Sequence, residues 1–385
     1  MSRKIRMGMI GGGKDAFIGS VHRMAAALDG QIDLVCGAFS SHPEKSKESG
    51  KALMLPDERV YGSFEEMINK EKQLPEDVRM DFVSIVTPNV MHFPPAKMAL
   101  ENGFHVVSDK PATFTLQEAK DLLGLVEKTG LIYALTHNYT GYPMVKEARH
   151  LVRSGKLGKI RKVVVEYPQG WLATTLENSN KQASWRADPK RAGISNCMGD
   201  IGTHAENLAE YITGLQITEL CADLGPIVEG RDLDDDGNVL LRFDNGAKGV
   251  LHASQISVGE ENRLNIRVYG EKGGLEWHQM EPNTLLVKWP DRPVEIYRTG
   301  LDHGYLSELA QKHTRIPAGH PEGYVEAFAN LYRNFAYTLQ AQLDGKTPDP
   351  DMDFPTIKDG VRGMAFIENV VASNKSSEKW HKFTI

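Results

Sequence analysis

Cysteine is scarce in this sequence, and its cysteines lie far apart. The 385 residues include three, Cys36, Cys197 and Cys221. None forms a Cys-x-x-Cys pair, so neither a disulfide framework nor a cysteine-based zinc site is supported. The thirteen histidines include no His-Glu-x-x-His pattern, which weakens a metal-hydrolase interpretation. We therefore expect a site without a metal, and cysteines that are buried small side chains in a reducing cytoplasm.

Long apolar runs and an excess of positive charge are also missing. No run approaches the roughly 20 residues that a helix needs to span a bilayer. The charged stretch before Gly11 has too short an apolar run for a signal peptide. The net charge of −6 argues against nucleic acid or an anionic membrane as a partner. We expect a cytoplasmic protein, and the length of 385 residues favours two domains.

Short apolar runs alternate with helical patterns over the first 135 residues. The runs lie at 5–10, 32–38, 82–86, 104–107 and 131–135, and the helical patterns at 18–28, 64–71, 94–101 and 116–128. Two of the helical patterns open with capping boxes, Ser63-x-x-Glu66 and Thr115-x-x-Glu118. This alternation predicts a doubly wound parallel sheet of the Rossmann type, in a first domain at 1–135.

After Pro143 the runs become longer and richer in β-branched residues. A helical pattern at 144–153 precedes strand patterns at 160–167, 239–243, 249–257, 264–269 and 285–289, and helical patterns return at 324–343 and 357–373. Residues 171–192 have no clean period, so we expect a loop at the rim of the site. We predict a second domain at 136–385, with a large, mostly antiparallel sheet and helices on one face. Because exposed β-branched sheet faces usually pair, we expect a homodimer or homotetramer.

A glycine-rich loop follows the first predicted strand. Gly11-Gly12-Gly13-Lys14-Asp15-Ala16 fits the pattern G-x-G-x-x-A and precedes a helical pattern. Glycines there permit a tight turn and a close approach of the backbone to a pyrophosphate, and the helix N-terminus offers N–H groups to the anion. Three glycines in a row would also suit a flexible turn, but the strand before and the helix after favour dinucleotide binding. The expected contacts are Gly11, Gly13, Lys14, Asp15, Ala16, Phe17 and Ile18.

The acidic residue that would hold the ribose of NAD is missing. Ser40 and Ser41 stand at the end of the second predicted strand, where an aspartate would bind the 2′-hydroxyl, and no arginine is present for a 2′-phosphate. Both hydroxyls can hydrogen-bond a ribose or a phosphate. The sequence therefore leaves NAD and NADP open, with a slight preference for NAD.

Three side chains have the chemistry for moving a proton. Lys110 comes just after the apolar run at 104–107, so it should lie at the carboxyl end of a parallel strand. Asp200 and His204 are four residues apart, a spacing that places two side chains on one face of a helix. Taken alone, Asp200 and His204 would equally suit a surface pair. Together with Lys110 and the glycine loop, they point to an oxidoreductase.

Three motifs resemble those of a known family. They are Thr87-Pro88-Asn89-x-x-His92, Asp109-Lys110-Pro111 and Asp200-Ile201-Gly202-Thr203-His204. Their order along the whole chain is similar to that of the Gfo/Idh/MocA family, which includes glucose–fructose oxidoreductase and inositol dehydrogenase. The chain departs from the usual pattern at Asp109, where glutamate is common, at Ser40-Ser41, and at Asn196-Cys197-Met198, which replaces small residues beside the expected substrate wall.

The resemblance implies an NAD(P)-dependent dehydrogenase acting on a ring hydroxyl of a sugar, cyclitol or anhydrosugar. Lys110, Asp200 and His204 would then surround the reacting carbon, while Thr87, Pro88, Asn89, His92 and Asp109 would lie along the cofactor. His204 is the natural base, because an imidazole has an unperturbed pKa near 6.5. Lys110 would stabilise the developing alkoxide. His92 would equally suit a purely packing or helix-capping role.

Other polar and aromatic side chains are candidates for substrate contact. Asn138 and Tyr139 follow the last strand of the first domain, at the edge where ligands gather in open α/β sheets. Trp171 and Arg186 lie in the irregular segment, and a tryptophan face with a guanidinium would suit a polyol; tryptophan is as often a core or interface anchor. His320 stands before a helical pattern, where it would contact substrate or cap the helix. We interpret the acidic run 234–236 as a solvated turn.

Two other functions fit the same motifs. One is a redox-neutral glycoside hydrolase that retains NAD, oxidises C3, eliminates the aglycone and then reduces the sugar again; it would need a further base for C2, which the sequence does not identify. The other is a non-catalytic cofactor sensor. The presence of Lys110, Asp200 and His204 argues against a sensor, because sensing needs no proton relay.

Overall fold

The computed structural model describes residues 3–14, 16–177, 179–186 and 188–385. The chain divides into two compact units, which we describe separately. The first contains Met1–Asn138 and Tyr324–Val361, and the second contains Tyr139–Gly323 and Arg362–Ile385. The first unit thus takes in a late segment of the chain, a return that the local sequence patterns do not indicate.

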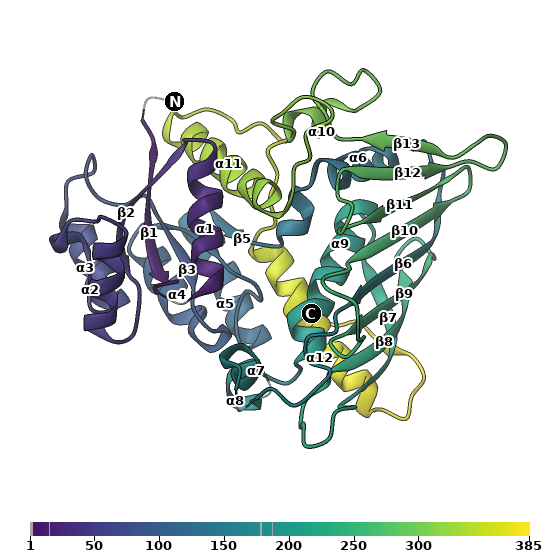
Figure 1. Ribbon diagram of the computed structural model, residues 1–385, viewed down its shortest axis with the longest axis horizontal. Helices are drawn as coiled ribbons and strands as arrows, with labels where there is room; N and C mark the ends of the chain where they lie inside the picture. Colours follow the sequence, from purple (N-terminus) through teal and green to yellow (C-terminus); the bar gives the residue numbers. More distant parts are fainter. Residues whose placement is uncertain (1–2, 15, 178, 187) are drawn as a thin grey trace. The chain divides into compact units, whose positions relative to one another are not determined.

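The first unit is built on a five-stranded parallel sheet (Figure 1). Its strands are β1 (Ile5–Gly11), β2 (Ile32–Ala38), β3 (Phe82–Val86), β4 (His105–Ser108) and β5 (Tyr133–Leu135), in the order β2-β1-β3-β4-β5. Its helices are α1 (Phe17–Leu28), α2 (Pro43–Ala52), α3 (Phe64–Gln73), α4 (Phe93–Glu101), α5 (Leu116–Thr129) and α11 (Tyr324–Leu343). The predicted doubly wound sheet is confirmed.

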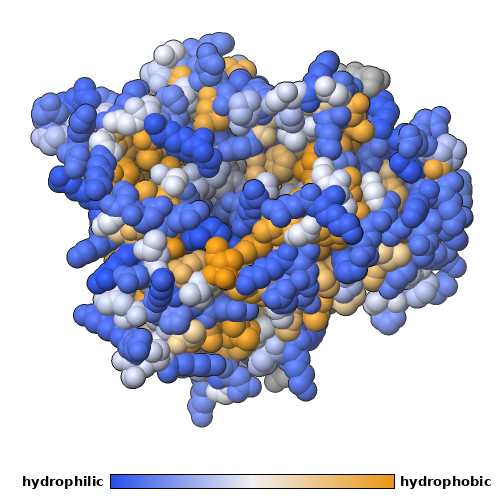
Figure 2. Space-filling view, turned by 180° about the vertical axis from the view of Figure 1, so that it is seen from behind, coloured by the Kyte–Doolittle hydropathy of each residue, from blue (hydrophilic) through white to orange (hydrophobic). Residues whose placement is uncertain are grey.

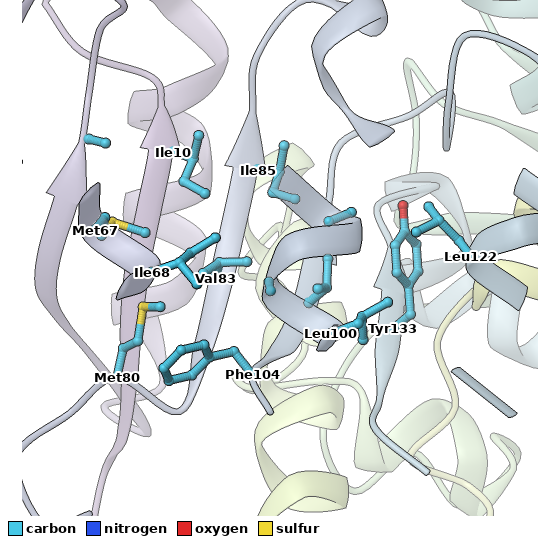
Figure 3. Packing of buried hydrophobic residues seen from close by; sticks show 14 of the residues in the cluster. Ile10, Met67, Ile68, Met80, Val83, Ile85, Leu100, Phe104, Leu122 and Tyr133 are labelled. Carbon is cyan, nitrogen blue, oxygen red and sulfur yellow. The ribbon is translucent and has the colours of Figure 1, made fainter. Parts of the chain in front are cut away.

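Alternate residues of the strands enter two separate cores. Ile10 and Ile85 pack in one cluster with Met67, Leu100 and Leu122, which come from α3, α4 and α5 (Figure 3). In a second cluster, Met7 and Met9 of β1 pack with side chains of α1 and α11, which are Val21, Phe328, Tyr332 and Phe335. Helices therefore cover both faces of the sheet, which explains why its strands read as nearly continuous apolar runs.

Helix α2 is absent from the sequence prediction. Its residues are mostly polar, and it buries only the small residues Ser46, Ser49 and Gly50. A helix that packs through serine and glycine has no apolar stripe for periodicity to detect. The signal that was present is Pro43 at the first turn, a favoured position for proline.

The second unit contains a nine-stranded sheet, in the order β13-β12-β11-β10-β6-β9-β8-β7-β14. The strands are β6 (Ile160–Pro168), β7 (Ile217–Gly225), β8 (Asp236–Phe243), β9 (Lys248–Ser254), β10 (Asn265–Gly270), β11 (Gly274–His278), β12 (Thr284–Lys288), β13 (Glu295–Arg298) and β14 (His381–Lys382). Among the strand pairs that the described residues form in this sheet, only β6 and β9 are parallel. The predicted, mostly antiparallel sheet is confirmed.

The helices of the second unit include α6 (Pro143–Arg153), α9 (Thr203–Thr213) and α10 (Glu308–Lys312), and α12 (Ile357–Lys375) continues into it from the first unit. Helices α6 and α9 lie along one face of the nine-stranded sheet (Figure 1). Inward residues such as Val163, Val165 and Tyr167 of β6 are buried there, and their neighbours are more exposed. This period of two is typical of a sheet with one covered face.

Three expectations about irregular segments and cysteines are wrong. Residues 171–192 are not all loop, because they contain the short helices α7 (Lys181–Arg186) and α8 (Pro189–Ala192), the latter capped by Asp188. The acidic run is not solvated, because Asp235 is 0% exposed and Asp234 is also buried. Cys36 and Cys197 are buried as expected, but Cys221 is partly exposed.

Figure 2 shows hydrophilic residues over much of the visible face, with apolar residues between them. This distribution agrees with a charged content of 25%. None of the helices in the described ranges is long and apolar enough to cross a membrane.

Candidate active site

The strand order of the first sheet reverses between β1 and β3. In open α/β sheets, ligands bind at the carboxyl ends of the strands next to such a reversal. Gly11, the last residue of β1, pairs with Val86, the last residue of β3. The glycine loop and the segment Thr87-Pro88-Asn89 therefore leave the sheet side by side at this point.

The glycine loop has the geometry of a dinucleotide cradle. Gly12 has a φ of +67°, and a Cβ there would meet Val86 Cγ2 at 2.6 Å and Gly19 Cα at 2.9 Å. A Cβ on Gly19 would meet Gly12 Cα at 2.3 Å. The close approach of the first turn of α1 to the loop therefore depends on Gly19, and not on Ala16 at the third position of the motif. Among the described residues, no side chain caps the N-terminus of α1. These features fit the pyrophosphate of a dinucleotide.

The other residues expected around the cofactor are near this loop or follow β2. Gly13 packs against Ser49, whose hydroxyl accepts from the Lys14 N–H at 3.1 Å. Phe17 is 70% exposed at the start of α1. Ser40 accepts from the His42 N–H at 3.1 Å in a local turn. Lys14 and Ser41 are exposed, Ala16 and Ile18 partly so, and Asp15 lies outside the described residues.

His92 braces two of the predicted motifs against each other. Its ring is buried, with Nδ1 2.7 Å from the Pro111 carbonyl oxygen and Nε2 2.9 Å from that of Thr87. It occupies the N-cap position of α4, but its side chain does not cap the helix. The imidazole thus ties the end of β3 to the segment that carries Lys110.

Lys110 lies just past the carboxyl end of β4, as predicted. The backbone N–H of Asp109 donates to Ile85 at 2.9 Å, and the Asp109 carboxylate accepts from the Lys110 N–H at 2.9 Å and from the Thr136 hydroxyl at 3.1 Å. Nearby, burial lowers the pKa of His137 to about 3, and the positive charge of Lys110 contributes to that shift. Lys110 therefore stands beside a neutral imidazole and an anchored carboxylate.

A buried polar cluster lies next to Asp109. His22 of α1 has Nδ1 2.7 Å from the hydroxyl of Tyr332 in α11, and Ser84 of β3 lies 2.8 Å from the same hydroxyl. His22 Nε2 is 4.0 Å from Asp109 Oδ1 and makes no hydrogen bond within the described residues. This cluster joins the helix of the glycine loop to the Asp-Lys-Pro motif.

Buried neutral histidines should make stability pH-dependent. Burial lowers the pKa of His22 to about 4, although Asp109 opposes the shift. An unfolded histidine titrates near 6.5, so between pH 6.5 and 4 the unfolded state binds a proton that the folded state does not. Stability is thus full above pH 6.5 and falls as the pH drops towards 4, by at most about 1.4 kcal/mol per pH unit from this residue.

We therefore expect the melting temperature to fall between pH 7 and pH 5, and to fall less steeply in His22→Asn. Differential scanning fluorimetry at half-unit steps of pH would measure both slopes. An equal slope in the two proteins would show that His22 is not held neutral.

Asp200 and His204 are not on one regular α-helix. Residues Met198–Gly202 form a π-turn, and α9 begins at Thr203. The expected α-helical stacking of the two side chains is therefore replaced by a wider turn, in which the Thr203 hydroxyl donates to the Gly199 carbonyl at 3.1 Å. Such π-turns are frequent at functional sites.

Asp200 is held by Arg186 of α7. The guanidinium donates through Nε to Asp200 Oδ2 at 2.9 Å and through Nη2 to Oδ1 at 3.4 Å. It also stacks on aromatic rings, with Cζ 4.3 Å from the ring centroid of Trp185 and 5.7 Å from that of Trp171. The predicted substrate residues Trp171 and Arg186 thus lie together with Asp200.

His204 is packed against tyrosines. It is 6% exposed, and its ring lies edge-on to Tyr139 with centroids 4.8 Å apart and tilted to Tyr167 at 6.2 Å. The two tyrosine hydroxyls hydrogen-bond each other, and Asn262 Nδ2 donates to Tyr139 at 3.0 Å. Burial raises the pKa of Tyr139. The imidazole is therefore packed against a ring that stays neutral.

A hydrogen-bonded chain extends from this pair to Trp171. The Tyr167 hydroxyl and Gln169 Nε2 both donate to Asn262 Oδ1 at 2.7 Å. Trp171 Nε1 donates to Gln169 Oε1 at 3.0 Å. These contacts hold the partly exposed indole of Trp171 in one orientation.

Two further candidates differ in their surroundings. Asn138 is buried, and its Nδ2 has no hydrogen-bond partner among the described residues. His320 is exposed, and its Nδ1 lies 3.2 Å from the carbonyl oxygen of Pro317 in the same turn. Asn138 thus offers a donor for a bound molecule, whereas the contact of His320 is local; its role in substrate binding stays a prediction.

No local pattern in the sequence singles out Gln255 or indicates a site role for Asp234 or His22. Gln255 is fully buried and donates to Asp200 Oδ2 at 3.0 Å. Asn196, Cys197 and Met198, expected beside the substrate, are buried, and the Asn196 side chain donates to Gln255 at 2.9 Å. Isolated polar residues carry no periodicity. The only signal in the sequence for these contacts was the pair of adjacent aspartates, Asp234 and Asp235, just before β8.

The chain is similar to known oxidoreductases over its whole length. Residues 5–137 match the model of an oxidoreductase family with an NAD-binding Rossmann fold, and residues 145–276 match the GFO/IDH/MocA C-terminal domain. An inositol dehydrogenase homolog from Azotobacter vinelandii, in a crystal structure with NAD+, is 34% identical, with 100% of this chain and 98% of that chain covered and a TM-score of 0.94.

Two more comparisons concern ligands. An inositol dehydrogenase homolog from Azotobacter vinelandii, in a crystal structure with NADH and myo-inositol, is 33% identical, with 100% of this chain and 98% of that chain covered and a TM-score of 0.91. Levoglucosan dehydrogenase from Pseudarthrobacter phenanthrenivorans is 26% identical over 408 residues, which cover 98% of each chain.

Proposed function

The chain belongs to the Gfo/Idh/MocA family of NAD-binding oxidoreductases, and on that premise we propose that it moves a hydride between a ring hydroxyl or ketone of a sugar, cyclitol or anhydrosugar and a nicotinamide. The observation that carries the proposal is the place of Lys110, which follows β4 in the NAD-binding sheet, one strand away from the end of β3. The myo-inositol and levoglucosan named for the relatives support the substrate class.

The carboxyl edge of the first sheet would hold the dinucleotide. Gly11, Gly13 and the open N-terminus of α1 fit the pyrophosphate, with Lys14, Ala16, Phe17 and Ile18 around it. Ser40 and Ser41 would meet the adenosine ribose, and Thr87, Pro88, Asn89 and His92 would line the path towards Asp109 and Lys110. NAD bound here supplies the hydride acceptor.

The proton of the hydroxyl would pass to His204. The imidazole is held in place by its packing against Tyr139 and Tyr167, and a general base must be positioned within hydrogen-bond reach of the proton that it takes. Lys110 would donate a hydrogen bond to the same oxygen and stabilise its negative charge. Asp200, anchored by Arg186, would accept a hydrogen bond from the substrate or from the imidazole.

The remaining polar and aromatic groups suit a polyol. A tryptophan face packs well on sugar C–H groups, and Trp171 is held in place by Gln169. Asn138 has a buried donor without a partner among the described residues, and an unmet donor gains about 1–3 kcal/mol from a correct acceptor. Tyr139, Arg186 and His320 complete the proposed substrate contacts.

The test is NADH formation, followed at 340 nm with inositols, aldoses, glycosides and anhydrosugars, and with NAD and NADP in separate assays. We expect steady growth of absorbance with NAD and at least one polyol. Aglycone release from a nitrophenyl glycoside without net NADH would point instead to the redox-neutral hydrolase. Tight NADH binding with neither activity would contradict the proposal and favour a sensor.

A further inference from the structure

Gln255 joins three segments of the second unit. It follows β9 and is fully buried. Its backbone N–H donates to the Asp235 carbonyl at 2.8 Å, and its own carbonyl accepts from the Leu172 N–H at 3.0 Å. Its side chain reaches the π-turn, because Nε2 donates to Asp200 at 3.0 Å. One glutamine thus connects the segment after Trp171, the acidic run and Asp200.

The direction of the hydrogen bonds around Gln255 is fixed. Asn196 Nδ2 donates to Gln255 Oε1 at 2.9 Å, and Gln255 Nε2 donates to Asp200 Oδ2 at 3.0 Å. A carboxylate only accepts, so the amide cannot be turned round without losing both contacts. Arg186 also donates to Asp200, so N–H donors meet this carboxylate from two different elements.

Asp234 anchors the far end of the chain of contacts. Its carboxylate accepts from the backbone N–H groups of Asn196 at 3.0 Å and Met198 at 2.9 Å, and from the Ser195 hydroxyl at 3.0 Å. Ser195 in turn accepts from the Gly199 N–H at 3.2 Å. The buried carboxylate therefore accepts hydrogen bonds from backbone N–H groups at the start of the π-turn. At the start of a helix these groups have no partners within the helix itself.

We propose that Gln255 is a positioning residue for catalysis: held by Asn196 and, through the π-turn, by Asp234, it fixes the orientation of the Asp200 carboxylate that the substrate meets. The inference rests on the proposed function for its catalytic consequence. A shift of about 1 Å in such a group can lower the rate about 100-fold. Gln255 has no need to touch the substrate, and it acts only through Asp200.

Two near-isosteric substitutions distinguish positioning from bulk. Gln255→Met removes both polar contacts, and Gln255→Glu replaces the donor with a second carboxylate beside Asp200. We expect kcat/KM to fall about 10- to 100-fold in both at pH 8. When the introduced carboxyl group is protonated at low pH, its O–H can donate to Asp200 as the amide does. The activity ratio of Gln255→Glu to wild type should therefore rise as the pH falls from 8 to 5, whereas the ratio for Gln255→Met should stay flat.

The matched control is Gln340→Glu. Gln340 is also buried and donates to a carboxylate, Asp344, at 2.8 Å, but it belongs to α11. We expect this variant to melt a few degrees lower and to keep wild-type kcat/KM. NADH binding, measured by fluorescence, should be unchanged in all three variants, because none of these positions is assigned to the cofactor.

A measurement without substrate tests the contact itself. In a double-mutant cycle of thermal unfolding at pH 8, Asp200→Asn should recover part of the melting temperature lost in Gln255→Glu, because it removes one of two adjacent carboxylates. Additive effects would overturn the contact. Wild-type kcat/KM in both Gln255 variants, or equal ratios at every pH, would overturn the positioning role. A wild-type protein that forms no NADH from any polyol would overturn the proposed function, and with it the catalytic role, while the cycle still decides the contact.

Discussion

Replacing His204 by alanine should lower kcat by about 10²–10⁴-fold, the usual contribution of general acid–base catalysis. The imidazole is 6% exposed and packs edge-on against Tyr139 at 4.8 Å. The Tyr139 hydroxyl cannot take over as the base, because burial raises the pKa of Tyr139 and the hydroxyl therefore stays protonated. The loss should therefore fall on kcat, and stopped-flow measurement of NADH formation at saturating polyol would record it.

The matching control is His150→Ala. His150 lies in the last turn of α6 and has no proposed part in the reaction, so kcat should stay within about twofold of wild type, as is usual for a change away from the site. Titration with NADH should give the same affinity in both variants. If His204→Ala kept wild-type kcat, His204 would not be the base of the reaction, and the proposed proton relay would be wrong.

Replacing Gly12 by alanine should weaken NAD binding by at least about 10-fold, since each 1.4 kcal/mol is a factor of about ten. The φ of +67° costs an alanine about 1–2 kcal/mol. The new Cβ would also meet Val86 Cγ2 at 2.6 Å and Gly19 Cα at 2.9 Å, and such overpacking typically costs about a further 1–3 kcal/mol. The loop and α1 must move apart, which displaces the N–H groups that would meet the pyrophosphate.

Fluorescence titration with NADH would measure this loss, and Gly124→Ala is its control. Gly124 lies within α5, and a Cβ there would have no heavy atom within 4 Å. Alanine is the better helix former by about 1 kcal/mol, so this variant should melt at or above the wild-type temperature with unchanged affinity. Equal NADH affinity in Gly12→Ala and wild type would contradict the assignment of the cradle.

The elements with a strong local signal were the ones that the sequence could predict. The capping box between Thr115 and Glu118 forms as predicted, and α5 begins at Leu116, directly after its N-cap Thr115. The polar helix α2 and the short helices α7 and α8 gave no periodic signal, and the π-turn at Met198–Gly202 changed the geometry expected for Asp200 and His204. Local patterns report burial against a near neighbour, so elements that bury little or bend locally escape them.

The buried polar contacts could not be predicted, because their partners are far apart in the chain. Gln255 is 55 residues from Asp200, and His22 is 310 residues from Tyr332. A single glutamine or histidine has no spacing that reveals its partner. The acidic run 234–236 was misjudged for the same reason. Its charge predicted exposure to solvent, but the buried Asp235 carboxylate accepts from the Arg231 guanidinium and from two backbone N–H groups.

The sequence by itself determined the alternation that makes the first sheet parallel, the glycine loop, and the motifs that contain Lys110, Asp200 and His204. These features depend on neighbours in the chain, where period and spacing carry the information. Only the tertiary structure decided that α11 packs on the first sheet, that Gly19 closes on Gly12, and that Gln255 and Asp234 hold Asp200 and its turn. Those contacts arise when distant segments are buried together, because buried polar groups must then find partners that no local pattern specifies.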